Sequence, residues 1–129
     1  MAGGLVIRDA HFPGRAPIDA YGNGGFRFAE MSHVGSILCV PSGIYGWAPT
    51  QPDEIDGEAL KRVIEEKDEI DVLLLGVGTI PLPANNATVR ALRAAGIRFD
   101  TMTTGAAVRT FNVMVSEERR VAAGLLAVE

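Results

Sequence analysis

Cysteine, histidine and aromatic residues are scarce in this sequence. Its 129 residues include one cysteine, Cys39, only two histidines, His11 and His33, and 6% aromatic residues. A lone cysteine excludes an internal disulfide and is typical of proteins from a reducing compartment. So few histidines and cysteines also leave little material for a metal site or for a Ser–His–acid triad. We therefore expect a cytoplasmic protein that holds no metal and no cofactor.

Long apolar runs and clusters of positive charge are also missing. The longest nearly apolar run, residues 72–82, is too short to span a bilayer and is broken by Gly76, Gly78 and Pro81. The N-terminal stretch MAGGLVIRDAHFPG lacks the charged start and the apolar core of a signal peptide. The net charge is −4, and the 12 lysines and arginines are dispersed along the chain. We expect neither membrane insertion nor a nucleic-acid partner.

The first part of the chain has the pattern of β-structure within a single domain, residues 1–129. Short runs such as LVIRDAHF, APIDAYG and GFRFAE are separated by Pro13-Gly14 and Asn23-Gly24-Gly25, which predicts two or three antiparallel strands. The run SILCV, residues 36–40, predicts a strand buried on both faces, with Cys39 as a small core residue. Residues 41–52 are rich in glycine and proline and predict a loop that carries Trp47.

The last ninety or so residues alternate between strand and helix patterns. Helices are expected from Asp56 to about Lys67, from Asn85 or Asn86 to Gly96, and after Thr103 or Thr104. Strands are expected at residues 71–75, 97–102 and 120–128. This order predicts a three-layer α/β fold, with a central, mostly parallel mixed sheet flanked by helices and an additional N-terminal antiparallel β layer.

The helix that follows Thr103 has two different faces. Val108, Phe111 and Val115 lie on one apolar stripe, which predicts a face packed against the sheet. Arg109 and Asn112 lie on the opposite, polar row. An arginine in the first turns of a helix opposes the helix dipole, so a bound anion or an acidic side chain often accompanies it. The simpler interpretation is that Arg109 pairs with a carboxylate of its own chain or is solvated.

A candidate ligand site follows if the strands that end at Val40, Leu75 and Met102 are parallel. Their following loops would then meet at one edge of the sheet, where open α/β sheets bind ligands. The candidate residues are Ser42, Trp47, Gly76, Gly78, Thr79, Thr104, Gly105, Arg109 and Asn112. The alternative is that glycine and threonine are simply common in strand-to-helix turns. A dinucleotide site is not expected, because the Gly-x-Gly here has no third glycine and no helix opens directly after it.

Four stretches of the chain are similar to a known family. TGAAVRTFN, together with LLLGVGT, ILCVPSGIYGW and PLPANNATVRALRAAGI, resembles the family of small uncharacterised domains that includes mitochondrial complex I assembly factor 3. The resemblance implies a three-layer α/β fold and supplies no set of catalytic residues. We therefore expect a non-enzymatic protein-binding or assembly-type module. The alternative is a small enzyme, or a binder of a small anion or another small molecule, that uses the pocket at the C-terminal edge of the sheet.

Overall fold

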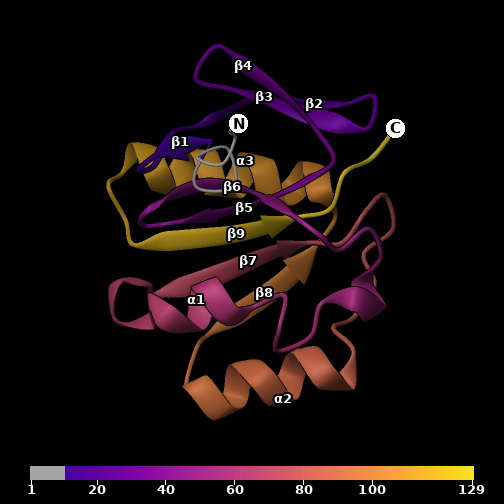
Figure 1. The fold of residues 1–129 in the computed structure, drawn as a ribbon, viewed down its shortest axis with the longest axis vertical. Coiled ribbons are helices and arrows are strands. Elements are labelled where there is room, and N and C mark those ends of the chain that lie inside the picture. The colour runs from indigo at the N-terminus through magenta and orange to yellow at the C-terminus, as the bar shows by residue number, and fades with distance from the viewer. Residues whose placement is uncertain (1–10) are drawn as a thin grey trace, which may run out of the picture.

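A six-stranded mixed sheet forms the middle layer of the molecule (Figure 1). In the computed structural model, which describes residues 11–129, its strands have the spatial order β1-β6-β5-β9-β7-β8. They are β1 (Phe12–Pro13), β5 (Ser36–Val40), β6 (Gly43–Trp47), β7 (Val72–Gly76), β8 (Phe99–Met102) and β9 (Val121–Leu125). The N-terminal part of the predicted strand LVIRDAHF, residues 5–10, lies outside the described residues.

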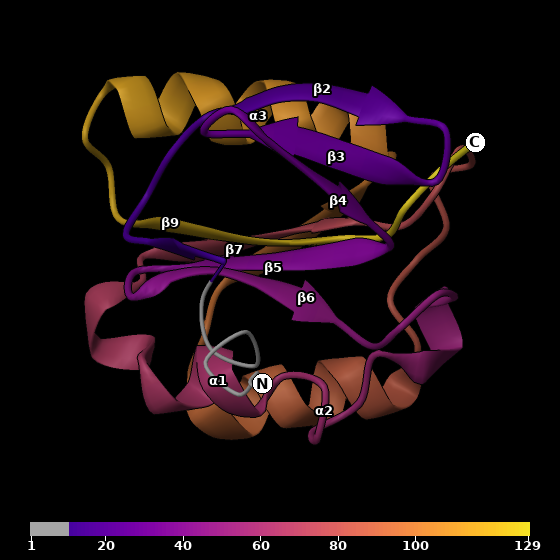
Figure 2. The same ribbon diagram turned by 45° about the horizontal axis from the view of Figure 1, so that its top comes forward.

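The other elements cover the two faces of this sheet (Figure 2). A three-stranded antiparallel sheet and α3 (Thr104–Ser116) lie on one face, and α1 (Lys61–Glu65) and α2 (Asn86–Ala95) lie on the other. The small sheet consists of β2 (Ile18–Gly22), β3 (Gly25–Phe28) and β4 (Met31–Val34). The predicted three-layer α/β fold with an N-terminal antiparallel layer is confirmed. No helix within residues 11–129 is long and apolar enough to cross a membrane.

The strands of the central sheet run in both directions. β7 is parallel to β8 and to β9, whereas β5 is antiparallel to both β9 and β6. The expectation that the strand ending at Val40 runs parallel to the strands ending at Leu75 and Met102 is therefore wrong. The loop predicted at residues 41–52 is also wrong in part, because Gly43–Trp47 turns back along β5 as strand β6. A turn of two residues allows only antiparallel pairing.

Alternate residues of the buried strands enter two separate cores. Ile37 and Cys39 of β5 pack with Phe28 and Phe111 on the side of α3, whereas Leu38 and Val40 pack on the side of α1 and α2. Such a continuous apolar run is expected of a strand that is covered on both faces. Cys39 is a buried core residue, as predicted, and its burial raises the pKa of the thiol.

Both longer helices begin where their capping residues predict, and α2 also ends at its predicted capping residue. Asn85 accepts a hydrogen bond from the Thr88 amide at 2.9 Å, and Gly96 has a φ of 72° at the end of α2. Thr103 caps α3 by accepting from the Ala106 amide at 3.2 Å. Phe111 is fully buried on the predicted apolar stripe.

The helix predicted for residues 56–67 is shorter than expected. Asp56 does accept from the Ala59 amide at 3.0 Å, but the α-helix spans only Lys61–Glu65 and is followed by a 3₁₀ turn, Lys67–Glu69. A further 3₁₀ turn, Pro52–Glu54, precedes it. Most of residues 48–60 therefore lies in an irregular segment that faces β6.

Candidate functional site

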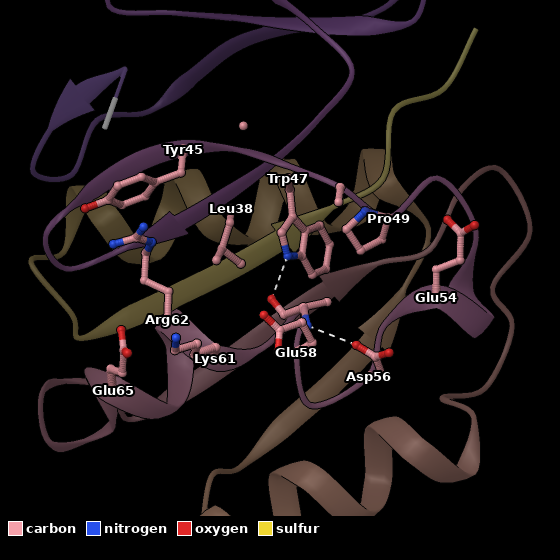
Figure 3. Close-up of a pocket in the computed structure, with 13 residues that line it drawn as sticks. Leu38, Tyr45, Trp47, Pro49, Glu54, Asp56, Glu58, Lys61, Arg62 and Glu65 are labelled. Carbon is pink, nitrogen blue, oxygen red and sulfur yellow. Dashed lines mark hydrogen bonds between the residues drawn. The ribbon is translucent and has the colours of Figure 1, made fainter. Parts of the chain in front are cut away.

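An open groove of about 700 Å³ runs between β6 and the irregular segment that leads into α1 (Figure 3). Leu38 of β5 lies on its floor, and Tyr45 and Trp47 of β6 form one wall. Residues 54–65 supply the charged opposite wall. The complete lining is Leu38, Tyr45, Gly46, Trp47, Ala48, Pro49, Glu54, Asp56, Glu58, Ala59, Lys61, Arg62 and Glu65.

Trp47 is held firmly in the wall of this groove. Its indole Nε1 donates a hydrogen bond to the Ala59 carbonyl at 2.9 Å, so it links β6 to the segment opposite. The ring also lies directly over β9, where a Cβ atom at Gly124 would stand 2.6 Å from the Trp47 ring. Gly124 therefore makes room for the indole, and Trp47 presents a fixed, half-buried aromatic surface.

Arg62 closes the Tyr45 end of the groove. Its guanidinium lies 3.7 Å from the centre of the Tyr45 ring, a cation–π arrangement. The Tyr45 hydroxyl lies 2.7 Å from Ser42 Oγ, and Ser42 in turn donates to both carboxylate oxygens of Glu66, at 2.9 and 2.6 Å. These contacts fix one end of the wall.

Acidic side chains outnumber basic ones along the lining. Glu54, Asp56, Glu58 and Glu65 carry negative charge, against Lys61 and Arg62. The Glu54 carboxylate accepts from the Thr50 amide at 2.7 Å and from the Thr50 hydroxyl at 3.1 Å. These hydrogen bonds lower the pKa of Glu54, that from the Thr50 amide most. The groove therefore combines an aromatic wall with an excess of negative charge.

A known protein family matches most of this chain. Residues 18–126 match the family described as a protein of unknown function (DUF498/DUF598). The chain belongs to the DUF498 family.

Proteins similar to this chain occur in bacteria and animals. An uncharacterised protein of Rhodobacter capsulatus is 34% identical over 122 residues, which are 95% of this chain and 93% of that protein. NADH dehydrogenase [ubiquinone] 1 alpha subcomplex assembly factor 3 of Drosophila melanogaster is 28% identical over 84% of this chain, which matches 57% of that longer protein. A crystal structure titled as an outer membrane protein from Bartonella henselae is 58% identical, with a TM-score of 0.85, over 92% of this chain and 100% of that chain.

The residues predicted from the other strand ends occupy the carboxyl edge of β7 and the start of α3. Thr104 is fully buried, donates through its hydroxyl to the Leu126 carbonyl at 2.8 Å and accepts from the Gly78 amide at 3.1 Å. Its own amide donates to the Gly78 carbonyl at 2.8 Å. A Cβ atom at Gly76 would lie 2.8 Å from the Thr104 Cα. These contacts tie together the ends of β7, β9 and α3.

Gly105, Arg109 and Thr79 lie near the surface at this edge. The Tyr21 hydroxyl covers Gly105, where an added Cβ would lie within 3.0 Å of the Tyr21 Cζ atom. Arg109 and Thr79 are exposed. Within residues 11–129, the Arg109 side chain has no ion pair and donates no hydrogen bond.

Asn112 and Ser42 lie apart from this edge. The Asn112 side chain accepts from the Ile18 amide and donates to the Ile18 carbonyl, both at 2.8 Å, so it joins α3 to β2. Ser42 lies at the opposite edge of the sheet, because β5 runs antiparallel to β9. Of the predicted residues, Trp47 lines the groove.

Sequence reasoning missed the other groove residues because it assigned them to different roles. The pattern of residues 56–67 predicts a continuous helix. In the structure Arg62 covers Tyr45, and Glu66 binds Ser42. One signal was available. Tyr45 and Trp47 are two residues apart, the spacing that places side chains on the same face of a strand.

The two histidines meet away from the groove. The rings of His11 and His33 have their centres 4.8 Å apart, and His33 Nε2 lies 3.2 Å from the Ser36 carbonyl oxygen. Burial, followed by repulsion from His11, lowers the pKa of His33. Across residues 11–129, His, Cys, Asp and Glu side chains form no group of three or more that would hold a metal ion.

Proposed function

We propose that this chain is a non-enzymatic protein-binding module of the assembly type, and that it engages its partner through the groove between β6 and residues 54–65. The observation that supports this proposal is the groove itself, in which a rigid aromatic wall lies opposite a charged rim. Protein interfaces share that composition, with aromatic residues at the centre and polar residues at the edge.

The relatives support the general class of the proposal. The Drosophila relative bears the name of an assembly factor, and assembly is a task performed through contacts with other proteins. We carry over only that general class.

Blocking the groove tests the proposal. Ala48 is an exposed lining residue, and Ala48→Phe would place a ring in the groove. Ala94→Phe adds the same ring on the exposed face of α2 and serves as the control. The tagged protein and both variants are purified from the native cell, and the co-purifying proteins are quantified by mass spectrometry. We expect a partner that is retained by Ala94→Phe and lost from Ala48→Phe. Equal recovery with both variants would rule the groove out.

A small-anion site beside α3 is the second candidate, and exposed Arg109 favours it. A guanidinium has a planar fork of donors that suits carboxylate or phosphate. However, the amides of Thr104, Ala106 and Ala107 already donate to Gly78 or Thr103. Saturable thermal stabilisation by millimolar sulfate, abolished in Arg109→Ala, would support this site. Stabilisation that rises steadily with salt in both proteins would be the general effect of an excluded ion.

We also propose a cytoplasmic location. Cys39 is a free, buried thiol, which fits a reducing compartment. The Bartonella henselae relative is titled as an outer membrane protein, which gives the alternative location. Fractionation of the native cell, followed by immunoblotting for this chain, separates the two locations.

A further inference from the structure

We infer that the groove receives a partner segment in which a lysine or arginine stands beside a large apolar side chain. This inference rests on the proposed function, since it specifies the chemistry of the partner at the same groove. Two features carry it: the distribution of charge along the groove, and the fixed apolar surface beside that charge.

The negative charge is concentrated at one end of the groove. Glu54 and Asp56 lie together at the Pro49 end, and Glu58 lies between them and Lys61 (Figure 3). At the other end, Glu65 lies beside Lys61, and the positive charge of Arg62 lies over the Tyr45 ring (Figure 3). A cationic side chain entering beside Pro49 would therefore meet carboxylates, whereas an anionic one would be repelled. Complementary charge of this kind selects partners and speeds their association.

The hydrogen bonds of Glu54 prepare its carboxylate for a cation. The Thr50 amide and hydroxyl bind the same oxygen, Oε1, so they fix the orientation of the carboxylate in the unbound protein. Neither of these two hydrogen bonds uses the other oxygen, Oε2, which faces a partner's cation from the exposed side chain. A carboxylate that is already oriented loses less conformational entropy when a partner binds.

An apolar side chain of the partner has a surface to cover next to these carboxylates. Leu38 lies on the floor, and the half-buried Trp47 ring stands in the wall. The volume of about 700 Å³ lies within the roughly 300–1,000 Å³ typical of ligand pockets. The groove therefore has room for a cationic side chain and an apolar one together.

Trp47 makes the test direct, because it is the only tryptophan in the chain and its emission reports on the groove. The probes are two short synthetic peptides flanked by Gly-Ser, one with the core Lys-Leu-Lys-Leu and the other with Glu-Leu-Glu-Leu. We expect the lysine peptide to change the Trp47 emission in a saturable way that weakens with added salt. The glutamate peptide should leave the emission unchanged. Equal responses to both peptides would overturn the inference.

Charge reversals locate the binding. Glu58→Lys should lower the affinity for the lysine peptide by about tenfold, which corresponds to about 1.4 kcal/mol of binding free energy. Asp68→Lys makes the same change outside the groove and should leave the affinity unaltered. Equal weakening by both variants would mean that only the net charge of the chain matters, and the inference would fail.

The chain itself contains a segment of the same chemistry, Leu5 to Arg8. If that segment occupied the groove, Arg8→Glu in the full chain would change the Trp47 emission without peptide and would strengthen peptide binding. That result would replace the partner by the chain's own N-terminal residues. If instead Ala48→Phe abolishes co-purification of a partner while neither peptide alters the Trp47 emission, the partner chemistry inferred here is wrong and the proposed function stands.

Discussion

Gly76 shows how a single missing side chain sets the distance between two elements. A Cβ atom at this position would lie 2.8 Å from the Thr104 Cα and 3.1 Å from the Ala107 side chain. The Thr104 Cα belongs to the backbone of α3, so no side-chain rotation relieves the clash. The helix is therefore able to approach the end of β7 only because residue 76 is glycine.

We expect Gly76→Ala to lower the free energy of unfolding by about 1–3 kcal/mol, the usual cost of overpacking. Gly57→Ala is the matched control, since a Cβ there would make only an ordinary contact, 4.0 Å from Ala91. Urea denaturation of both variants measures the difference. If the two variants are equally stable, α3 and β7 are not packed as closely as described.

Asn112 and Arg109 illustrate two polar residues of one helix with different roles. Asn112→Leu should cost about 1–3 kcal/mol, because the amide and carbonyl of Ile18 lose their partners. Arg109→Ala should change stability by no more than about 1 kcal/mol, as expected for an exposed side chain. Chemical denaturation tests both variants. A loss of several kcal/mol in Arg109→Ala would reveal a structural ion pair, and would remove Arg109 from the candidate anion site.

Helix α3 packs against the central sheet and the small sheet mainly through its apolar face. Phe111 is fully buried among residues of both sheets, so Phe111→Ala should cost about 3–5 kcal/mol. Val113 lies on the same helix but is 56% exposed, and Val113→Ala should have little effect. Thermal unfolding compares the two. An unchanged melting temperature for Phe111→Ala would show that the buried face of α3 is assigned wrongly.

Elements with strong local signals were predictable from sequence, whereas strand direction was not. Asn85, Gly96 and Thr103 mark the ends of their helices through side-chain capping and backbone conformation, which are local effects. The direction of β5 depends instead on its pairing with β9, whose partner residues are 84 to 88 positions further along the chain. The apolar run SILCV is equally compatible with parallel and antiparallel neighbours. Because the direction of β5 was predicted wrongly, Ser42 was assigned to the candidate site although it lies at the opposite edge of the sheet.

The groove was hidden from sequence reasoning for a related reason. It is built from β6 and residues 54–65, which are close in sequence but belong to a hairpin, an irregular segment and the short helix α1. The glycines and prolines of residues 41–52 favour a loop, and the tertiary pairing with β5 overrides that local preference. Only Trp47 was conspicuous enough by its type to be selected.

The contact between His11, which precedes β1, and His33 of β4 joins the central sheet to the small sheet. Because burial and then the neighbouring His11 lower the pKa of His33, the folded state favours the neutral imidazole. The unfolded chain binds a proton first, near its ordinary pKa of about 6.5. The contribution of the neutral His33 imidazole to the free energy of unfolding is therefore complete above that pH. It is lost as the pH falls from there through the lower pKa of His33 in the folded state.

We accordingly expect the melting temperature to fall on acidification from neutral pH toward pH 5. His33→Gln keeps a neutral hydrogen-bonding side chain near Ser36 and should reduce that fall. Calorimetry of both proteins across this pH range measures the effect. An identical dependence on pH in the two proteins would assign the acid sensitivity to other groups.

The central claim is that the groove beside Trp47 is a surface for binding a protein. Photo-cross-linking in the native cell tests it most directly, with benzoylphenylalanine placed at Lys61 in the groove or at Asp68 outside it. We expect the probe at position 61 to join this chain to a distinct partner polypeptide, and the probe at position 68 to give no such product. Cross-links that are absent at position 61, or equal at both positions, would contradict it.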